Sequence, residues 1–289
     1  MASTQVLKTR IRSVKSTKQI TKAMQLVAAS KMRRAQDATK ATAPYTLAAR
    51  ELLTALSTRN SVKRHPLFSA RDVSSRLVIV IASDKGLAGA YNSNVLKAYV
   101  DELKRDESAK VKNVTIAVGR KAAQFVARIK DSKVLGVYED LPDRPDGSEL
   151  RAILDSARDA FVSGEVDAVD VIYTEFLSSL NQKAKVLRVL PAGFNADATS
   201  SVSADFTYEP STEEVLDSVA YRLVSAQLFQ ALLDARASEH SMRMLAMKNA
   251  TDNASDLVDD LTLEMNKARQ GAITQELAEI SGGVEALNE

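Results

Sequence analysis

Residues 212–270 read TEEVLDSVAYRLVSAQLFQALLDARASEHSMRMLAMKNATDNASDLVDDLTLEMNKARQ and contain neither glycine nor proline. At about 1.5 Å per residue, this stretch would form a helix roughly 90 Å long, which exceeds the width of an ordinary small domain. The rest of the chain cannot bury such a helix alone. The apolar residues of its second half are spaced mostly by three and four positions, as in the seam of a coiled coil. They are Met247, Ala250, Ala254, Leu257, Leu261, Met265, Ala268 and Ala272. We therefore expect another surface to lie against this seam.

A second long helix is predicted from Ser3 to about Arg59, a stretch without glycine. Its apolar residues trace an incomplete helical stripe, and Thr17 and Thr21 stand where a strong seam would carry leucine. Pro44 is the only proline in this stretch, and proline removes a backbone N–H donor from a helix. We therefore expect the helix to be kinked or broken near Pro44.

The N-terminal residues 1–40 carry ten Lys or Arg and one acid, whereas the whole chain has 39 basic and 37 acidic residues. This bias predicts an acidic partner surface. A basic helix could also bind nucleic acid or an anionic membrane, but residues 1–44 hold no aromatic ring for stacking or interfacial anchoring. The same features resemble a mitochondrial transit peptide. We disfavour that reading because the pattern continues into residues 45–57 without a change of composition.

The middle of the chain alternates strand and helix patterns. Residues 76–83 (RLVIVIAS) form the β-branched apolar run that is typical of a strand buried on both faces of a parallel sheet. The other predicted strands are 114–119, 135–138, 170–176 and 183–190, and the predicted helices are 92–105, 120–129 and 148–163. This alternation predicts one α/β domain. The expected organisation is a helix at 1–60, a linker at 61–75, the α/β domain at 76–195, a connecting loop at 196–211 and a helix at 212–289.

Residues that usually carry catalysis are sparse. The chain has no cysteine and only two histidines, of which His65 lies in the predicted linker and His240 in the predicted helix, so no metal site is expected. The turn SDKGLAGAYN (83–92) stands between a strand and a helix, where glycine-rich loops can cradle phosphate. Gly86 and Gly89 match neither phosphate-binding spacing. We expect a plain turn or a turn for protein contact, and no cofactor, although a nucleotide-using α/β enzyme stays open as an alternative.

Four stretches together carry a resemblance to a known family. They are SEHSMRMLAMKNATDNASDLVDDLTLEMNKARQGAITQELAEISGGVEAL (238–287), VKSTKQITKAMQLVAASKMRRAQ (14–36), SDKGLAGAYN (83–92) and YEPS (208–211). Their order and length resemble the γ subunit of F-type ATP synthase over essentially the whole chain. One departure is Val284, which follows Gly283 where the family usually has alanine.

The resemblance implies an α/β fold with a long antiparallel coiled coil of the N- and C-terminal helices and an inserted Rossmann-like domain. It implies a non-catalytic rotor shaft that couples proton-driven rotation of the c ring to the catalytic β subunits. The implied partners are the α and β subunits as a hexamer, the ε subunit and the ring of c subunits, with no nucleic acid. The implied location is peripheral, on the cytoplasmic side of a bacterial plasma membrane. The alternative is a basic coiled-coil module that binds nucleic acid or membrane.

The resemblance also implies roles for individual residues. Contacts to the β-subunit catch loops are expected from Arg269, Gln270, Thr274 and Glu276. Contacts to an acidic lever segment of β are expected from Arg33, Arg34 and Lys85. An apolar bearing is expected from Met24, Ala28, Ala272 and Val284. The part of the foot near the c ring and ε is expected to include Phe206 and Tyr208.

Overall fold

The computed structural model describes residues 4–57, 62, 65–129, 133–142, 147–193 and 212–287. The chain forms two compact units, one of residues 1–27 with 244–289 and the other of residues 28–243. Two helices, α1 (Thr4–Ser57) and α5 (Thr212–Leu287), each contribute to both units. Among the described residues, no helix combines the length and the apolar character needed to span a bilayer.

Both long helices begin close to where the sequence predicts. The helix α5 starts at Thr212 and runs through Gly271 to Leu287, as the resemblance implies. The helix α1 is continuous through Pro44, so the prediction of a break there is wrong, and the alternative of a kink stays a prediction. Proline in a helix interior costs about 3 kcal/mol, and tertiary packing must offset this cost. The residues of α1 that follow Pro44 supply such packing, because Ala49, Leu53 and Leu56 are buried in the core of the larger unit.

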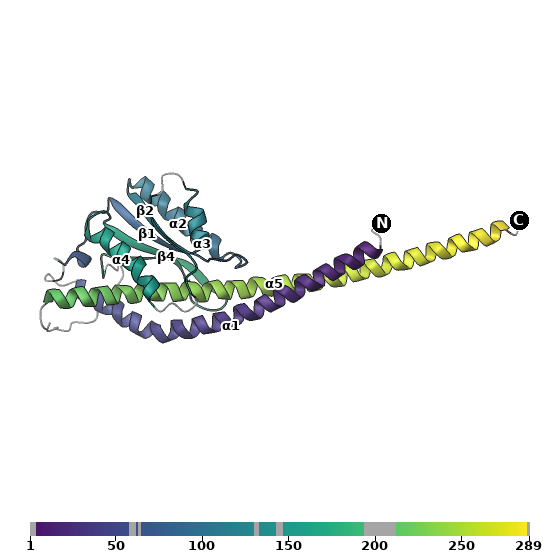
Figure 1. Cartoon of the computed structure of the whole chain (residues 1–289), viewed down its shortest axis with the longest axis horizontal. Coiled ribbons are helices and arrows are strands. Elements are labelled where there is room, and N and C mark those ends of the chain that lie inside the picture. Colours follow the sequence, from purple (N-terminus) through teal and green to yellow (C-terminus); the bar gives the residue numbers. More distant parts are fainter. Residues whose placement is uncertain are drawn as a thin grey trace. The chain divides into compact units, whose positions relative to one another are not determined.

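The larger unit is built on a five-stranded sheet (Figure 1). The strands are β1 (Ser75–Ile81), β2 (Lys112–Val118), β3 (Lys133–Tyr138), β4 (Ala168–Phe176) and β5 (Gln182–Leu190). Their spatial order is β3-β2-β1-β4-β5, in which the first four strands are parallel and β5 is antiparallel to β4. The helices are α2 (Tyr91–Ser108), α3 (Arg120–Val126) and α4 (Ser148–Val162). The parallel part has the strand order of a Rossmann half, which confirms the predicted fold class.

Alternation along β1 divides the core into two layers. Leu77, Ile79 and Ile81 belong to the layer that contains α4 and parts of α1 and α5. Val78 and Val80 point to the opposite face, where α2 and α3 cover the sheet (Figure 1). A central strand that is buried on both faces needs apolar residues at every position, which explains the continuous run in the sequence. The packing unit thus extends beyond residues 76–195, because segments of both long helices complete one layer.

The segment predicted as a linker, 61–75, takes part in this core. A short 3-10 helix, η1 (Pro66–Phe68), lies within it, and its Leu67 and Phe68 are each 5% exposed. The imidazole of His65 accepts a hydrogen bond from the Leu67 N–H at 3.3 Å and so caps η1. The backbone of Leu67 also accepts a hydrogen bond from Ala192 at 2.7 Å. A plain linker at these positions is therefore the wrong description, since the segment is anchored at several points.

The smaller unit is an antiparallel pair of helices. Leu7 and Ile11 of α1 pack with Val258 and Leu261 of α5. Further along, Lys18 donates to Ser255 at 2.9 Å, and Thr251 donates to Thr21 at 2.8 Å. Residue numbers fall along α1 as they rise along α5, which establishes the antiparallel direction. Two polar pairs thus interrupt the apolar contact between the helices.

The seam of α5 differs from the predicted one in its register. Its least exposed residues step alternately by four and three positions: Met247, Thr251, Ala254, Val258, Leu261, Met265 and Ala268. Leu257, which the sequence placed in the seam, is 47% exposed, and Val258 takes its place. The predicted register is wrong because the seam contains the polar residue Thr251 and not its neighbour Ala250. A strict heptad that includes polar residues is present nonetheless.

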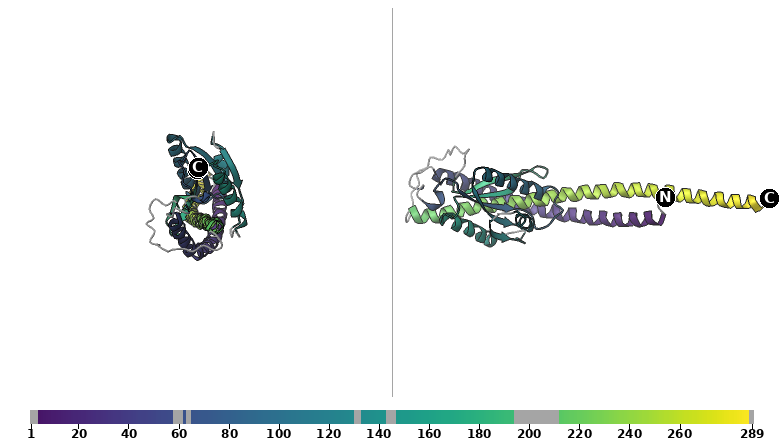
Figure 2. Two further views of the ribbon diagram at one scale, coloured as in Figure 1. Left: turned by 90° about the vertical axis from the view of Figure 1, so that its left-hand side faces the viewer. Right: turned by 90° about the horizontal axis from the view of Figure 1, so that it is seen from above.

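Beyond this pair, α5 continues past the N-terminal end of α1, as its yellow end in Figure 2 shows. Every side chain that the structure describes from residue 269 to residue 281 is exposed. Ala272, predicted as a seam residue, is among them. The last turns of α5 are thus a single helix without a partner from the described part of this chain.

Candidate functional site

The turn 83–92 lies at the carboxyl end of β1, the central strand of the sheet. Ser83 is fully buried, and its N–H and its hydroxyl both lie within hydrogen-bonding distance of the Asn92 amide oxygen, at 3.1 and 3.0 Å. The hydroxyl of Ser83 also lies 2.7 Å from the backbone oxygen of Lys85, to which it donates. These contacts fix both ends of the turn against the start of α2.

Asp84 ties this turn to the neighbouring strands. Its Oδ1 accepts hydrogen bonds from the backbone N–H groups of Arg120 and Asp140, each at 3.0 Å. These two residues follow β2 and β3, whose carboxyl ends lie at the same edge of the sheet. One carboxylate therefore joins the loops that follow three adjacent strands.

The helix α5 holds the same turn from its other side. Arg243 donates to the backbone oxygens of Lys85 at 3.1 Å and of Gly86 at 3.2 Å. Arg236 donates to the backbone oxygen of Leu141 at 2.8 Å. Glu239, which is 4% exposed, binds both guanidinium groups, at 3.1 Å from Arg236 and 2.8 Å from Arg243. Three charged residues on successive turns of α5 thus bind the loops at the sheet edge.

Burial shapes the electrostatics of this cluster. Burial alone would lower the pKa of Arg236, but the attraction of Glu239 and Asp84 outweighs it, so the pKa is raised and the guanidinium stays charged. Tyr91 is fully buried beside the cluster, and burial together with the Glu239 charge raises the pKa of its hydroxyl above the usual value. The cluster therefore consists of fixed charges and a neutral phenol near neutral pH.

This geometry argues against a phosphate cradle at the turn. A cradle presents backbone N–H groups to the anion, whereas here the carbonyl oxygens of residues 85 and 86 are turned to arginines. The turn leaves Lys85 exposed, as a contact residue requires, and Leu87 is 62% exposed. Leu87 was missed by the sequence interpretation, although a large apolar residue between two glycines could have indicated it. Its φ of 60° lies in the left-handed region, which is strained for leucine.

The two histidines do not form a catalytic or metal centre. His240 is 4% exposed on α5, and its Nδ1 lies 3.3 Å from Arg243. His65 caps η1 in the core. In the ranges that the structure describes, no three His, Asp or Glu side chains gather as a metal ion would need.

The residues predicted to contact other subunits differ in their solvent exposure. Those that are exposed are Arg33, Arg34, Lys85, Arg269, Gln270, Ala272, Thr274 and Glu276. Met24 is half-buried, and Ala28 is only 2% exposed, which argues against a bearing role for Ala28. Val284 belongs to α5, but its side chain lies outside the described part of the structure. Phe206 and Tyr208 also lie outside the described residues.

A further exposed apolar surface, which the sequence analysis did not predict, lies near the end of α5. Ile273, Leu277 and Ile280 are 49%, 62% and 65% exposed, and their spacing of four and three places them on one face of α5. We call these three residues the terminal stripe. The sequence carries the signal, because Ile273, Leu277 and Ile280 are themselves spaced by four and three residues. Large apolar side chains that line one face of an unpartnered helix are typical of an interaction surface.

Comparisons with known proteins agree over the full chain. A family model described as ATP synthase matches residues 3–287. The ATP synthase gamma chain of Ralstonia nicotianae is 40% identical over 294 residues, covering 99% of this chain and 100% of that protein. The gamma chain of Staphylococcus saprophyticus is 38% identical over 292 residues, with the same coverage.

Solved structures share the fold. A central stalk and c-ring structure of the Tetrahymena thermophila mitochondrial ATP synthase contains a chain that is 26% identical, with a TM-score of 0.60. The match covers 80% of this chain and 99% of that one. A chain of the Euglena gracilis mitochondrial ATP synthase is 18% identical, with a TM-score of 0.71, and covers 98% of this chain and 94% of its own length. The chain belongs to the ATP synthase gamma chain family, and its function is that of the non-catalytic gamma subunit in the central rotor of ATP synthase.

Proposed function

We propose that the chain works as a shaft that turns with a ring of c subunits and, through its two long helices, changes the conformations of β subunits in an α/β hexamer. The ε subunit completes the rotor foot in this proposal. The complex lies at the bacterial plasma membrane, with this chain peripheral on the cytoplasmic side. The observation that carries the proposal is the unpartnered end of α5, where the terminal stripe and four polar residues are exposed together.

The terminal stripe suits a bearing. Apolar side chains gain free energy from leaving water wherever they touch an apolar sleeve, and this gain has no preferred direction. A surface of this kind stays bound at many rotational angles. Ala272 adds a small side chain to the same exposed region, and Val284 extends the expected bearing along α5.

Polar residues beside the terminal stripe make some rotational angles of the shaft more favourable than others. Hydrogen bonds and ion pairs from Arg269, Gln270, Thr274 and Glu276 to the catch loops form only at particular angles. A ligand or subunit shifts a conformational equilibrium only by its differential affinity for the states. One asymmetric shaft inside three β subunits would favour a different state in each, and rotation would exchange these preferences. Exposed ion pairs are worth about 0–1 kcal/mol each, so no single angle becomes a trap.

The foot must carry torque without deforming. Asp84, Arg236, Glu239 and Arg243 bind α5 to the loops at the sheet edge, so a force on the α/β unit reaches α5 through buried ion pairs. In this proposal the exposed Lys85 faces the acidic lever segment of β. Arg33 and Arg34, exposed on α1, share this role and account for the basic N-terminal bias.

Reconstitution tests the proposed function. Purified α and β subunits are assembled with and without this chain, and ATPase activity is measured together with rotation of a bead attached to the foot. The proposal expects stable, rotating complexes only when the chain is present. Activity and assembly that do not depend on the chain would contradict it. Salt-sensitive binding of the free chain to DNA or anionic vesicles would instead support the alternative module, which the family assignment disfavours.

Replacing Arg269 with alanine is expected to weaken coupling without changing the fold. Arg269 is exposed on the unpartnered part of α5, so the free energy of unfolding should change by less than about 0.5 kcal/mol. Loss of a catch contact worth about 1 kcal/mol should lower the population of the engaged orientation about five-fold relative to the disengaged one, and proton pumping per ATP hydrolysed should fall as a result. Lys267→Ala removes an exposed cation two residues away on α5, serves as the matched control and should keep normal coupling. A marked loss of stability with intact coupling would refute the assignment of Arg269.

A further inference from the structure

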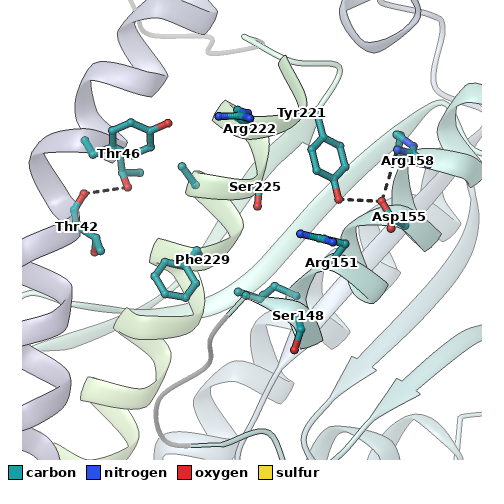
Figure 3. Close-up of a pocket in the computed structure, with 14 residues that line it drawn as sticks. Thr42, Thr46, Ser148, Arg151, Asp155, Arg158, Tyr221, Arg222, Ser225 and Phe229 are labelled. Atoms are coloured by element: carbon teal, nitrogen blue, oxygen red, sulfur yellow. Dashed lines mark hydrogen bonds and ion pairs between the residues drawn. The ribbon is translucent and has the colours of Figure 1, made fainter. Parts of the chain in front are cut away.

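A cleft of about 980 Å³ opens on the larger unit between α1, α4 and α5 (Figure 3). Its volume is at the upper end of the range for small-molecule pockets, which is roughly 300–1,000 Å³. None of the residues expected to contact other subunits lines it. The cleft therefore stands apart from the surfaces that the proposed function uses.

Three arginines from two helices line the cleft: Arg151 and Arg158 on α4 and Arg222 on α5. Among the lining residues that the structure describes, Asp155 is the only acid. It already accepts a hydrogen bond from the Tyr221 hydroxyl at 2.9 Å and lies 3.5 Å from Arg158. The lining thus has an excess of two positive charges.

The two excess charges belong to Arg151 and Arg222. Arg158 is engaged, because it also binds Asp159 at 2.8 Å and lies over the Tyr221 ring at 5.5 Å from its centroid. Arg151 and Arg222 make no hydrogen bond or ion pair with any residue that the structure describes. Figure 3 shows Arg151 extending from α4 in the direction of α5. Two guanidinium groups without a hydrogen bond or ion pair to a described residue therefore border one cleft.

Further donors face the same space. The hydroxyl of Ser225 on α5 lies in the cleft between the arginine-bearing helices (Figure 3). The first turn of α4, at Gly147, Ser148 and Leu150, lines one wall, and the amino end of a helix carries a partial positive charge. All these groups favour an anion, and the guanidinium fork matches the oxygens of phosphate.

We propose that this cleft is a binding site for a phosphate-bearing anion with at least two negative charges. A single carboxylate would neutralise only one of these two guanidinium groups, whereas a pyrophosphate group carries enough negative charge for both. The cleft is also much larger than a carboxylate requires. This inference is independent of the proposed rotor function, since a rotor shaft needs no small anion.

The test is calorimetric titration of the full chain with inorganic pyrophosphate to about 5 mM, a range that detects millimolar dissociation constants. The variants are Arg151→Gln and Arg222→Gln, which remove a charge and retain a polar side chain of similar length. Arg128→Gln is the control, because Arg128 is exposed after α3 and does not line the cleft. Thermal unfolding of each variant checks that the fold is retained.

We expect saturable binding to the natural chain, weakened about ten-fold by either cleft substitution and unchanged by Arg128→Gln. Absence of binding to the natural chain overturns the proposal. So does an equal loss with Arg128→Gln, which would indicate unspecific attraction to positive charge. A hexaglutamate peptide that binds as tightly, with the same dependence on Arg151, would assign the cleft to acidic peptides and also overturn it. Reconstitution with α and β subunits tests the proposed rotor function separately, so failure of anion binding and failure of the rotor function can be distinguished.

Discussion

Replacing Arg76 with leucine is expected to lower the free energy of unfolding of the larger unit by about 3–5 kcal/mol. Arg76 stands on β1 with only 6% of its surface exposed. It binds Asp106 at 2.6 Å, Asp170 at 2.9 Å and Glu102 at 3.1 Å. Leucine fills much of the space but removes the cation that these three carboxylates share. Asp170 keeps Arg188, which is 23% exposed, and Glu102 keeps only the exposed Arg105. An uncompensated buried charge costs far more than an ion pair gains.

The loss of stability caused by Arg76→Leu should be smaller in mild acid. Burial raises the pKa of Asp106, while attraction and hydrogen bonding from Arg76 lower it. Removing Arg76 therefore raises the folded-state pKa of this carboxyl further above its unfolded value. A group with a raised folded pKa takes up a proton on folding, so stability is gained as the pH falls through that pKa. The variant should thus recover part of its stability as the pH falls from neutral through the raised pKa of Asp106.

Urea unfolding followed by tyrosine fluorescence measures this effect. All seven tyrosines lie between residues 45 and 221, within the larger unit, so the signal reports on that unit alone. Arg105→Leu is the matched control. Arg105 binds Glu102 at 2.5 Å, but its side chain is 75% exposed, and we expect a loss of less than about 1 kcal/mol. The prediction is contradicted if the two substitutions lower the free energy of unfolding equally, or if the effect of Arg76→Leu does not change with pH. Either result would show that the unpaired buried carboxylates are not the cause of the lost stability.

The strands and helices could be predicted because each follows from a local pattern. The run RLVIVIAS requires burial on both faces, and β1 has it. The seam could be predicted only in part, because Thr251 pairs with Thr21, a residue 230 positions away. A polar residue enters a seam when its partner hydrogen-bonds to it, and this partner is not visible in local sequence. The same reason explains why residues 61–75 were predicted as a linker, since the core that buries Leu67 and Phe68 comes from distant elements.

In the candidate sites, too, local motifs could be predicted from the sequence, whereas contacts between distant residues could not. The turn 83–92 was recognisable as a motif, but the arginines that hold it lie 152 and 158 residues further along the chain than the turn residues they contact. Arg151 and Arg222 come together only because α4 and α5 pack in one layer, so the sequence could not indicate the cleft. Contacts with other subunits depend on surfaces of those subunits. Burial within this chain therefore distinguishes an exposed residue such as Arg269 from a covered one such as Ala28, and the pairing itself stays a prediction.

Replacing Gly119 with alanine is expected to cost about 3 kcal/mol or more, because it combines backbone strain with a steric clash. Gly119 follows β2 and has φ 89° and ψ 144°, a conformation that residues with a side chain rarely adopt. An added Cβ would overlap the carbonyl oxygen of Ala82 and lie 2.9 Å from its carbonyl carbon. Relief would displace the end of β1 and with it Asp84, which binds the N–H of Arg120 at 3.0 Å. The turn that carries Lys85 would move as well, so coupling should fall together with stability.

The matched control for this prediction is Gly86→Ala in the same turn. Gly86 does not have a positive φ, and an added Cβ would meet nothing within 4 Å. Alanine there reduces the freedom of the unfolded chain, so stability should be unchanged or higher by about 0.4–1 kcal/mol. Tyrosine-monitored urea unfolding compares the two variants, and proton pumping by the reconstituted complex compares their function. If Gly119→Ala unfolds at the same urea concentration as Gly86→Ala, the close approach of β2 to β1 does not hold the turn in place. If both variants couple normally, torque does not pass through this edge of the sheet.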